Sequence, residues 1–448
     1  MLGALVASAC GSSSRSDTSG ATATTAADSG TSSAKTFGDL PSPCGKGTPK
    51  ASTDQGVTDK AVTIGYGDDA GYAASPGLNH EVADAVKGAI KWCNDQGGIN
   101  GRTIEGKYYD AKILEAANVM TEACTQVFML VGEGFAFDGG AEQKRVECGL
   151  PAVPGYSVSA AFAHGPLMSQ AVPNPTDFAP MQMTAAIAKA FPAEIKKSAV
   201  MFANYSATIE TKEKVLATYP HFGFNFLPCP QEYNIAGESD WKPFAQKLKD
   251  CGAQVVYFTG SPYPNFENFL DAANQLDYKP IYMTDANFYD EAFAKWNKDG
   301  LGDKVYVREA FPPLDEADSV KAIKDYISIV DAVGGDKDQL GEQAMSSFML
   351  WATAAKACPA LTRDCIQTEL KKITKWTGGG LHAETNPTSN KPPTCGVTLK
   401  LEGAKFVRFD PKAKGKFDCS PEYVQPVKGK VVDDAKLGPD RISTLYKK

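Results

Sequence analysis

The chain has 448 residues, 43% of them hydrophobic and 22% charged, which is the balance of a folded protein with two or three domains. Its 46 Lys and Arg against 53 Asp and Glu give a net charge of -7, which disfavours a protein that binds nucleic-acid phosphates. No apolar run approaches the roughly 20 residues that cross a bilayer. A membrane-spanning protein is therefore disfavoured as well.

The first ten residues, MLGALVASAC, form a short apolar stretch that ends in small residues just before Cys10. This resembles the end of a bacterial lipoprotein signal, in which the cysteine receives lipid, although Ala7 stands where leucine is usual and no basic segment precedes it. The alternative is an ordinary apolar N-terminus with an incidental cysteine. Residues 11–42 begin with a tract of Ser, Thr, Ala and Gly and are predicted to form a flexible tether. We therefore expect a lipid anchor on Cys10 as the chain's only attachment to a membrane.

Eleven cysteines occur beside only four histidines, with no CxxC or HExxH motif, so no metal site and no cofactor is expected. If Cys10 stands alone, the other ten cysteines can form up to five disulfides. Such a number of disulfides indicates an oxidising location outside the cytoplasm.

From residue 57 on, β-branched runs alternate with segments of helical periodicity. The first half predicts strands at 62–66, 103–109, 128–132 and 152–155, with helices at 82–93, 115–126 and 141–147. After the proline-bearing segment 170–176, helices are predicted at 179–190, 208–219, 240–249 and 265–276, and strands at 198–204, 255–259, 281–284 and 305–309. Helices at 319–333, 343–357 and 363–372 and a β-hairpin at 397–410 complete the order. This rhythm predicts an α/β protein with two parallel sheets, whose strand ends face a shared cleft.

An ordered series of motifs runs through the same region: VTIGY at 62–66, NDQGGINGR at 94–102, GLPAVP at 149–154 and AVPNPT at 171–176. In this order they resemble the type I solute-binding proteins of ABC transporters, in the leucine/isoleucine/valine-binding branch. The resemblance implies two Rossmann-like lobes joined by a hinge, as in type I periplasmic binding proteins. The expected boundaries are 57–172 with about 315–376 for lobe 1, 173–314 with about 377–425 for lobe 2, and a loose C-terminal tail at 426–448.

The resemblance also suggests a disulfide between Cys124 and Cys148, a pair that the family often bridges. Local spacing favours four further pairs: Cys44–Cys93, Cys229–Cys251, Cys358–Cys365 and Cys395–Cys419. Ten cysteines allow hundreds of pairings, however, and the sequence alone does not select among them.

By matching positions, Asp285 falls where the family places an acidic residue against the ligand's ammonium group. Tyr156 and Ser157 lie in a loop that holds the ligand carboxylate, whereas Phe135 stands where the family usually has serine. Further acids and rings lie in the loops of the predicted cleft: Asp68, Asp69, Tyr72, Tyr205, Tyr263 and Tyr289. Acids beside aromatic rings suit an amine-bearing ligand through cation–π contacts. The alternatives are packing for the rings and turn capping for the acids.

Enzyme motifs are incomplete or missing, since no GxGxxG, phosphate loop, GxSxG or catalytic triad is found, and catalysis is not expected. The sequence predicts an exported, lipid-anchored protein that captures a small polar molecule, an amino acid or amine, between two lobes. It would deliver that ligand to an ABC permease. Two alternatives remain open: a ligand-sensing domain for a membrane signalling partner, and an exported hydrolase.

Overall fold

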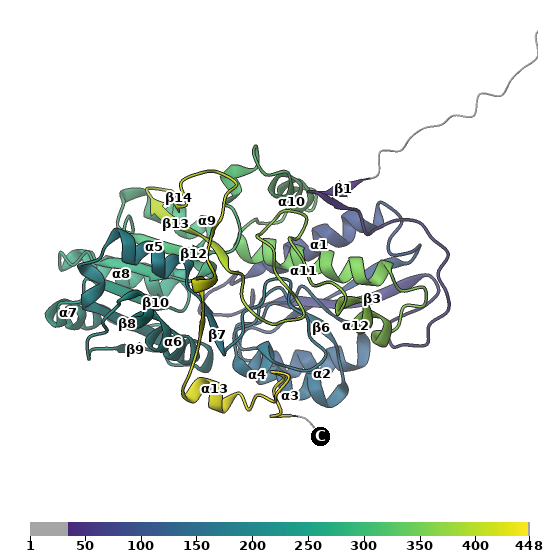
Figure 1. Cartoon of the computed structure of the whole chain (residues 1–448), viewed down its shortest axis with the longest axis horizontal. Coiled ribbons are helices and arrows are strands. Elements are labelled where there is room, and N and C mark those ends of the chain that lie inside the picture. The colour runs from purple at the N-terminus through teal and green to yellow at the C-terminus, as the bar shows by residue number, and fades with distance from the viewer. Residues whose placement is uncertain (1–34, 447–448) are drawn as a thin grey trace, which may run out of the picture. The chain divides into compact units, whose positions relative to one another are not determined.

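The structure, a computed structural model, describes residues 35–446, which form two α/β lobes, each built on one sheet (Figure 1). The predicted fold of two lobes with parallel sheets is confirmed. Cys10 and residues 11–34 lie outside the described residues. Within 35–446, no helix combines the length and the apolar character that crossing a membrane requires.

Lobe 1 has a four-stranded parallel sheet in the order β4-β3-β5-β6. Its strands are β3 (Ala61–Asp68), β4 (Thr103–Asp110), β5 (Met129–Val131) and β6 (Ala152–Val153). One face packs on α1 (His80–Asn94), α10 (Lys321–Asp331), α11 (Gln339–Lys356) and α12 (Arg363–Leu370). The other face packs on α2 (Ala116–Gln126) and α3 (Gly139–Cys148), and the short α4 (Ala160–Ala163) follows (Figure 1). Helices on both faces explain why β3 is buried over most of its length.

Lobe 2 has a larger sheet in the order β14-β13-β12-β11-β10-β8-β9, with β15 paired to β13. The parallel part contains β8 (Ser198–Ala203), β9 (Gln231–Tyr233), β10 (Val255–Thr259), β11 (Ile281–Thr284) and β12 (Val305–Glu309). The antiparallel part contains β13 (Cys395–Glu402), β14 (Lys405–Asp410) and β15 (Asp418–Cys419), so the predicted hairpin is present. One face packs on α5 (Gln182–Ala190) and α6 (Ser206–Thr218). The other packs on α7 (Lys242–Cys251), α8 (Glu267–Gln275) and α9 (Glu291–Trp296).

Three connections carry the chain between the lobes: residues 164–177, residues 310–320 and the segment that leads from α12 to β13. Part of the last segment differs from the predicted boundary, because residues 377–385 pack on lobe 1. Leu381 is fully buried in the lobe 1 core, and Thr385 donates a hydrogen bond to the carbonyl of Ala171. The segment has no helix or strand periodicity, so its partner could not be read from the sequence pattern.

The end of the predicted tether belongs to the folded body. Strands β1 (Thr36–Phe37) and β2 (Leu40–Pro41) form a small hairpin, and Phe37 is fully buried against lobe 1. The amide of Gly38 donates to Asp325 at 2.8 Å. The burial of Phe37 therefore places the start of the folded body within residues 11–42, which the sequence predicts to be a flexible tether.

The C-terminal segment is ordered as well, which corrects the expected loose tail. Strand β16 (Val424–Pro426) pairs with β7 (Phe178–Pro180), and α13 (Lys430–Asp434) contacts both α6 and α4. Val431 is buried, and Arg441 forms a two-point ion pair with Asp177. The high Lys and Asp content of this segment favoured a loose tail in the sequence analysis, and neither contact is marked by a pattern along the chain.

Five disulfides are present, and they join the same pairs that local spacing and the resemblance favour: Cys44–Cys93, Cys124–Cys148, Cys229–Cys251, Cys358–Cys365 and Cys395–Cys419. Each links segments no more than 49 residues apart. Each bridge therefore links two segments of the same lobe, and no disulfide joins the two lobes within residues 35–446.

Candidate functional site

A cavity of about 200 Å³ lies between the two lobes. Lobe 1 contributes loops that follow β3 and β6, and lobe 2 contributes α6 together with loops that follow β10 and β11. The carboxyl ends of parallel strands are where α/β sheets bind ligands. Apolar groups form much of the wall: Leu78, Ile113, Val158, Val172, Pro173, Met181, Val215, Ile235, Leu340 and Pro393.

The lobe 1 wall is neutral. Tyr72, Tyr156 and Ser157 line the cavity, as expected from the sequence, together with Asn79. The side-chain amide of Asn79 donates to the hydroxyl of Tyr156 at 2.8 Å, and the hydroxyl of Ser157 donates to Gln170 at 2.6 Å. Burial raises the pKa of Tyr156 well above its ordinary value, so this ring stays uncharged.

The acids of lobe 1 do not line the cavity, contrary to expectation. Asp68 is buried and accepts hydrogen bonds from Tyr108 at 2.6 Å and from the amide of Ala70 at 3.0 Å. Asp69 is fully buried and accepts from the amides of Ile113 and Ala136, both at 2.6 Å. Burial raises the pKa of Asp68 to about 6 and the pKa of Asp69 to about 7. Both side chains hold loops in place behind the cavity wall.

Three of the predicted aromatic residues do not line the cavity, because they pack in the core or against other loops. Phe135 is buried in the lobe 1 core beside α2 and α3. Tyr289 accepts a hydrogen bond from the amide of Leu314, and its ring packs edge-on against Phe406. Tyr263 is absent from the cavity wall, and its carbonyl accepts from Ser75 of lobe 1 at 3.1 Å. Tyr205, in contrast, lines the cavity as predicted.

Asp285 lines the cavity, but its carboxylate is already paired. One oxygen accepts from Nε and Nη2 of Arg308, at 3.0 and 2.9 Å, and the other accepts from the hydroxyl of Tyr257. About a quarter of each side chain of the Asp285–Arg308 pair is exposed. The carboxylate expected to meet a ligand's ammonium group is therefore balanced by a cation of the protein.

Lys214 of α6 is a charged cavity residue that sequence reasoning missed. Its ammonium group donates to the carbonyl of Pro175 at 2.9 Å and reaches Oδ1 of Asn174 at 3.5 Å. Burial, with the positive charge of Arg308, lowers the pKa of Lys214 to about 8. The available signal was its helix face, since Ala207, Thr211 and Thr218 lie on the same side of α6.

Two further wall residues, Glu309 and Gln339, carry side-chain polar atoms that have no hydrogen-bond partner among residues 35–446. Burial raises the pKa of Glu309 well above its ordinary value, and the neighbouring carboxyl of Glu342 raises it further. The pKa of Glu342 is raised in the same way by burial. For both acids, burial therefore favours the neutral, protonated form.

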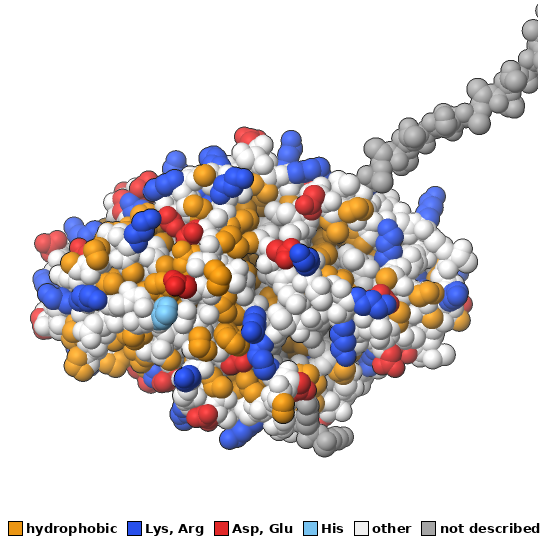
Figure 2. Space-filling view, viewed as in Figure 1, with side chains coloured by type: hydrophobic (Ala, Val, Ile, Leu, Met, Phe, Trp, Pro, Cys, Tyr) orange, Lys and Arg blue, Asp and Glu red, His pale blue; other side chains and the backbone are white. Residues whose placement is uncertain are grey.

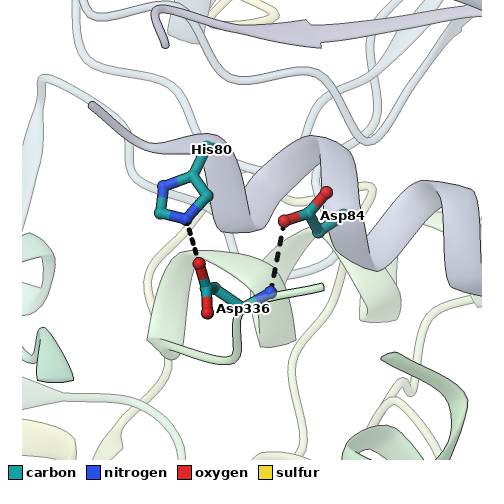
Figure 3. A group of neighbouring side chains, drawn as sticks. All are labelled: His80, Asp84 and Asp336. Carbon is teal, nitrogen blue, oxygen red and sulfur yellow. Dashed lines mark hydrogen bonds and ion pairs between the residues drawn. The ribbon is translucent and has the colours of Figure 1, made fainter. Parts of the chain in front are cut away.

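A cluster of possible metal ligands, His80, Asp84 and Asp336, lies on lobe 1 outside the cavity (Figure 3). His80 Nε2 lies 2.5 Å from Asp336, and Asp84 accepts from the backbone amide of Asp336 at 3.2 Å. The other ring nitrogen of His80 lies 2.6 Å from the carbonyl of Gly77. These contacts satisfy the cluster from within and explain its geometry without an ion.

Comparison with known proteins assigns the fold. The family model of the periplasmic binding protein matches residues 61–405. The fatty acid ABC transporter substrate-binding protein from Thermomonospora curvata is 16% identical, with a TM-score of 0.68 over 83% of this chain and 96% of that chain.

Two other solved structures are similar. The branched-chain amino acid transporter substrate-binding protein LivJ from Streptococcus pneumoniae, in complex with isoleucine, is 16% identical with a TM-score of 0.64 over 78% of this chain and 100% of that one. The leucine-binding protein LivK from Thermotoga maritima is 15% identical, with a TM-score of 0.66 over 78% and 98%. No curated protein matches the sequence. Since the family model covers more than half of its length, the chain belongs to the periplasmic binding protein family.

Proposed function

We propose that this protein is an extracytoplasmic solute-binding protein that closes on a small organic molecule and delivers it to an ABC permease. The observation that carries the proposal is the cavity between the lobes, which takes its walls from both of them. A ligand that touches both walls stabilises the closed arrangement of the lobes over the open one. The three connections between the lobes, with no disulfide across them, leave room for that hinge motion.

The character of the ligand follows from the walls. Apolar side chains predominate, and the neutral groups of lobe 1 face the charged groups of lobe 2. Of the proteins with similar structures, one is a fatty acid transporter substrate-binding protein and another was solved in complex with isoleucine. A fatty acid and isoleucine each combine a polar head with an apolar body. The sequence favours a ligand with an amine head group, but the expected partner of that amine, Asp285, is already bonded to Arg308.

The proposal includes a permease partner and a lipid anchor on Cys10. A tether between the anchor and the folded body would keep the protein close to its permease and raise the local concentration of loaded protein. Replacement of Cys10 by serine should release the protein from membranes while ligand binding stays unchanged.

The test is native mass spectrometry of the full chain carrying Cys10→Ser, followed by denaturation and identification of released molecules. We expect a small organic molecule, chemically unchanged, that raises the melting temperature when it is added back. Thr211→Trp, which fills the cavity from α6, should abolish the bound mass. Leu216→Trp, at an exposed position of the same helix that does not line the cavity, should keep it.

Two results would contradict the proposal. The first is a protein that carries no molecule and shows no thermal shift with amino acids, amines, carboxylic acids or sugars. The second is recovery of a chemically altered ligand, which would favour the hydrolase alternative.

A further inference from the structure

The lobe 2 wall carries an excess of positive charge inside the molecule. Lys214 and Arg308 line the cavity together with Asp285, which is already paired with Arg308, and with Glu309, whose carboxyl oxygens have no hydrogen-bond partner among residues 35–446. On the outer face in Figure 2, by contrast, Lys and Arg side chains are interspersed with Asp and Glu. The concentration of cations is therefore a feature of the cavity and not of that surface.

Arg308 has donors left after pairing with Asp285. A guanidinium group offers five N–H donors, and Asp285 takes those of Nε and Nη2. Asp285 is itself fixed by the hydroxyl of Tyr257, so the pair holds the guanidinium plane in one orientation. The remaining N–H groups of Arg308 can therefore donate to a second acceptor in the cavity.

Lys214 has no carboxylate partner among residues 35–446, because its contacts are the carbonyl of Pro175 and the amide oxygen of Asn174. The acids near it are engaged elsewhere. Glu210 accepts from the amide of Ala160, and Asp177 pairs with Arg441. A partly buried ammonium group bonded only to neutral oxygens is costly, and an anion beside it lowers that cost.

The remaining acid of the wall, Glu309, does not offer a paired negative charge. Both of its carboxyl oxygens are buried without a hydrogen-bond partner among residues 35–446, and burial together with the carboxyl of Glu342 raises its pKa, which favours the neutral form. Lys214, Arg308 and Asp285 together therefore leave one net positive charge in a mostly apolar cavity. Low polarity strengthens the attraction of that charge for an anion.

We propose that Lys214 and Arg308 form an anion subsite that binds the carboxylate of an amphipathic organic acid, whose apolar body lies against the remaining cavity wall. This inference rests on the proposed function and names the ligand class of the same cavity. Asp285 acts as a positioning residue that orients Arg308, which differs from the role that the sequence assigned to it. The ligand's carboxylate forms the ion pair that Lys214 lacks among residues 35–446.

The test uses three probes with one apolar tail and different heads: octanoate, octanamide and octylamine. Isothermal titration calorimetry with the full chain carrying Cys10→Ser should give octanoate at least about tenfold tighter binding than octanamide, and no binding of octylamine. Lys214→Met should reduce octanoate affinity about tenfold and leave octanamide affinity unchanged. Lys214→Arg keeps the positive charge and should therefore retain most of the octanoate affinity of the unsubstituted protein.

Lys212→Met is the matched control, since it removes the same charge from the same helix at a position outside the cavity wall. It should leave the octanoate affinity unchanged. Far-ultraviolet circular dichroism and the melting temperature of each variant show whether it is folded.

Proton uptake gives an independent readout. The pKa of Lys214 is lowered to about 8, so the group is about half protonated at pH 8 in the free protein. Octanoate would raise that pKa, and calorimetry in buffers of different ionisation enthalpy should show uptake of about half a proton at pH 8 and almost none at pH 6.5. The groups around Lys214 are Arg308 of β12, Asp285 after β11, Glu210 of α6 and Asp177 of the connection. Lys214→Met should abolish the uptake.

Equal affinity for octanoate and octanamide, or a preference for octylamine, would overturn the anion subsite. Binding of other solutes without octanoate would also overturn it and would leave the proposed function standing. A protein that binds no solute of any class would overturn both.

Discussion

The two lobes use the same residue type in opposite ways. Each lobe places aspartate just after a strand beside the cavity: Asp68 and Asp69 after or at the end of β3, and Asp285 after β11. In lobe 1 the backbone amides of Ile113 and Ala136 capture Asp69, which turns it into a structural support. In lobe 2 the available donors are side chains, from Tyr257 and Arg308, and Asp285 stays in the cavity wall.

This difference shows that the local supply of donors decides the role of a carboxylate. A loop that offers free amide groups draws the acid inward, away from the ligand. In lobe 2, Arg308 of strand β12 holds Asp285 at the cavity wall, and its positive charge balances the negative charge of the carboxylate. In neither lobe does an aspartate remain free to meet a ligand amine, although the sequence pattern is compatible with that role in both.

The largest expected effect separates the structural acid from the cavity acid. Asp69→Ala leaves the buried amide of Ile113 and the partly buried amide of Ala136 without acceptors. It also releases Ile113, whose backbone φ of 62° is unfavourable for a β-branched residue. We expect the free energy of unfolding to fall by about 2–4 kcal/mol in urea denaturation. Asp95→Ala, at an exposed ion pair of the same lobe, should cost less than about 0.5 kcal/mol. A loss below about 1 kcal/mol for Asp69→Ala, combined with lost ligand binding, would contradict the structural role.

The next prediction concerns a buried lobe 1 acid that has no partner. Glu133 is fully buried, both of its carboxyl oxygens lack a hydrogen-bond partner among residues 35–446, and burial raises its pKa to about 8. The folded protein therefore holds a proton that the unfolded chain releases above about pH 4.5. The contribution of Glu133 to the free energy of unfolding is therefore most favourable below about pH 4.5. It is lost as the pH rises toward 8, because the unfolded chain releases a proton that the folded protein keeps.

Glu133→Gln removes this titration. We expect it to raise the free energy of unfolding on the order of 2 kcal/mol at pH 8 and to change it little at pH 4.5. The measurement is urea denaturation at both pH values. Lys60→Gln, at an exposed position of the same lobe, is the control and should show no difference between the two pH values. An equal effect of Glu133→Gln at both pH values would show that the pKa of Glu133 is not raised in the folded protein.

The lobe 2 acid gives a smaller change in stability and the sharper test of ligand class. Asp285→Asn removes the negative charge beside Arg308 and keeps an acceptor for its N–H groups. We expect a loss of about 1 kcal/mol in stability, because the pair is about a quarter exposed. Octanoate affinity should rise severalfold, since the net charge of the cavity wall becomes more positive. If Asp285 instead holds a ligand amine, the same variant would weaken binding of an amine ligand and leave octanoate unchanged.

Much of the fold was predictable because it rests on patterns along the chain. Apolar runs marked β3 and β10, and helical periodicity marked α1 and α10. The predicted order of strands and helices, with the crossover at 170–176, was enough to indicate two lobes. Phe37 in the tether and Leu381 in the last connection were missed, since a single buried residue creates no period.

The site was harder to predict because it depends on pairings between distant positions. Five of the predicted residues line the cavity, since each lies just beyond a strand: Tyr72, Tyr156, Ser157, Tyr205 and Asp285. Their contact with a ligand stays a prediction. The partner of Asp285 lies 23 residues further along the chain, on a strand that reads as apolar. Lys214 lies on the side of α6 that also carries Ala207 and Thr218, but this helical periodicity indicates only a packed face and not that the lysine lines a cavity. Neither contact could be identified from neighbouring residues alone.

The smallest expected effect compares one tyrosine from each wall. Tyr156 of lobe 1 accepts a hydrogen bond from Asn79, and Tyr257 of lobe 2 donates one to Asp285. A hydrogen bond to a charged group contributes more than one between neutral groups. Tyr156→Phe should therefore lower the free energy of unfolding by about 0.5 kcal/mol and Tyr257→Phe by about 1 kcal/mol, as measured by urea denaturation. Octanoate affinity should change less than about threefold in Tyr156→Phe and more in Tyr257→Phe, because only the second variant disturbs the Asp285–Arg308 pair. The reverse order would mean that the lobe 1 wall, and not the charged wall of lobe 2, determines how the ligand head is held.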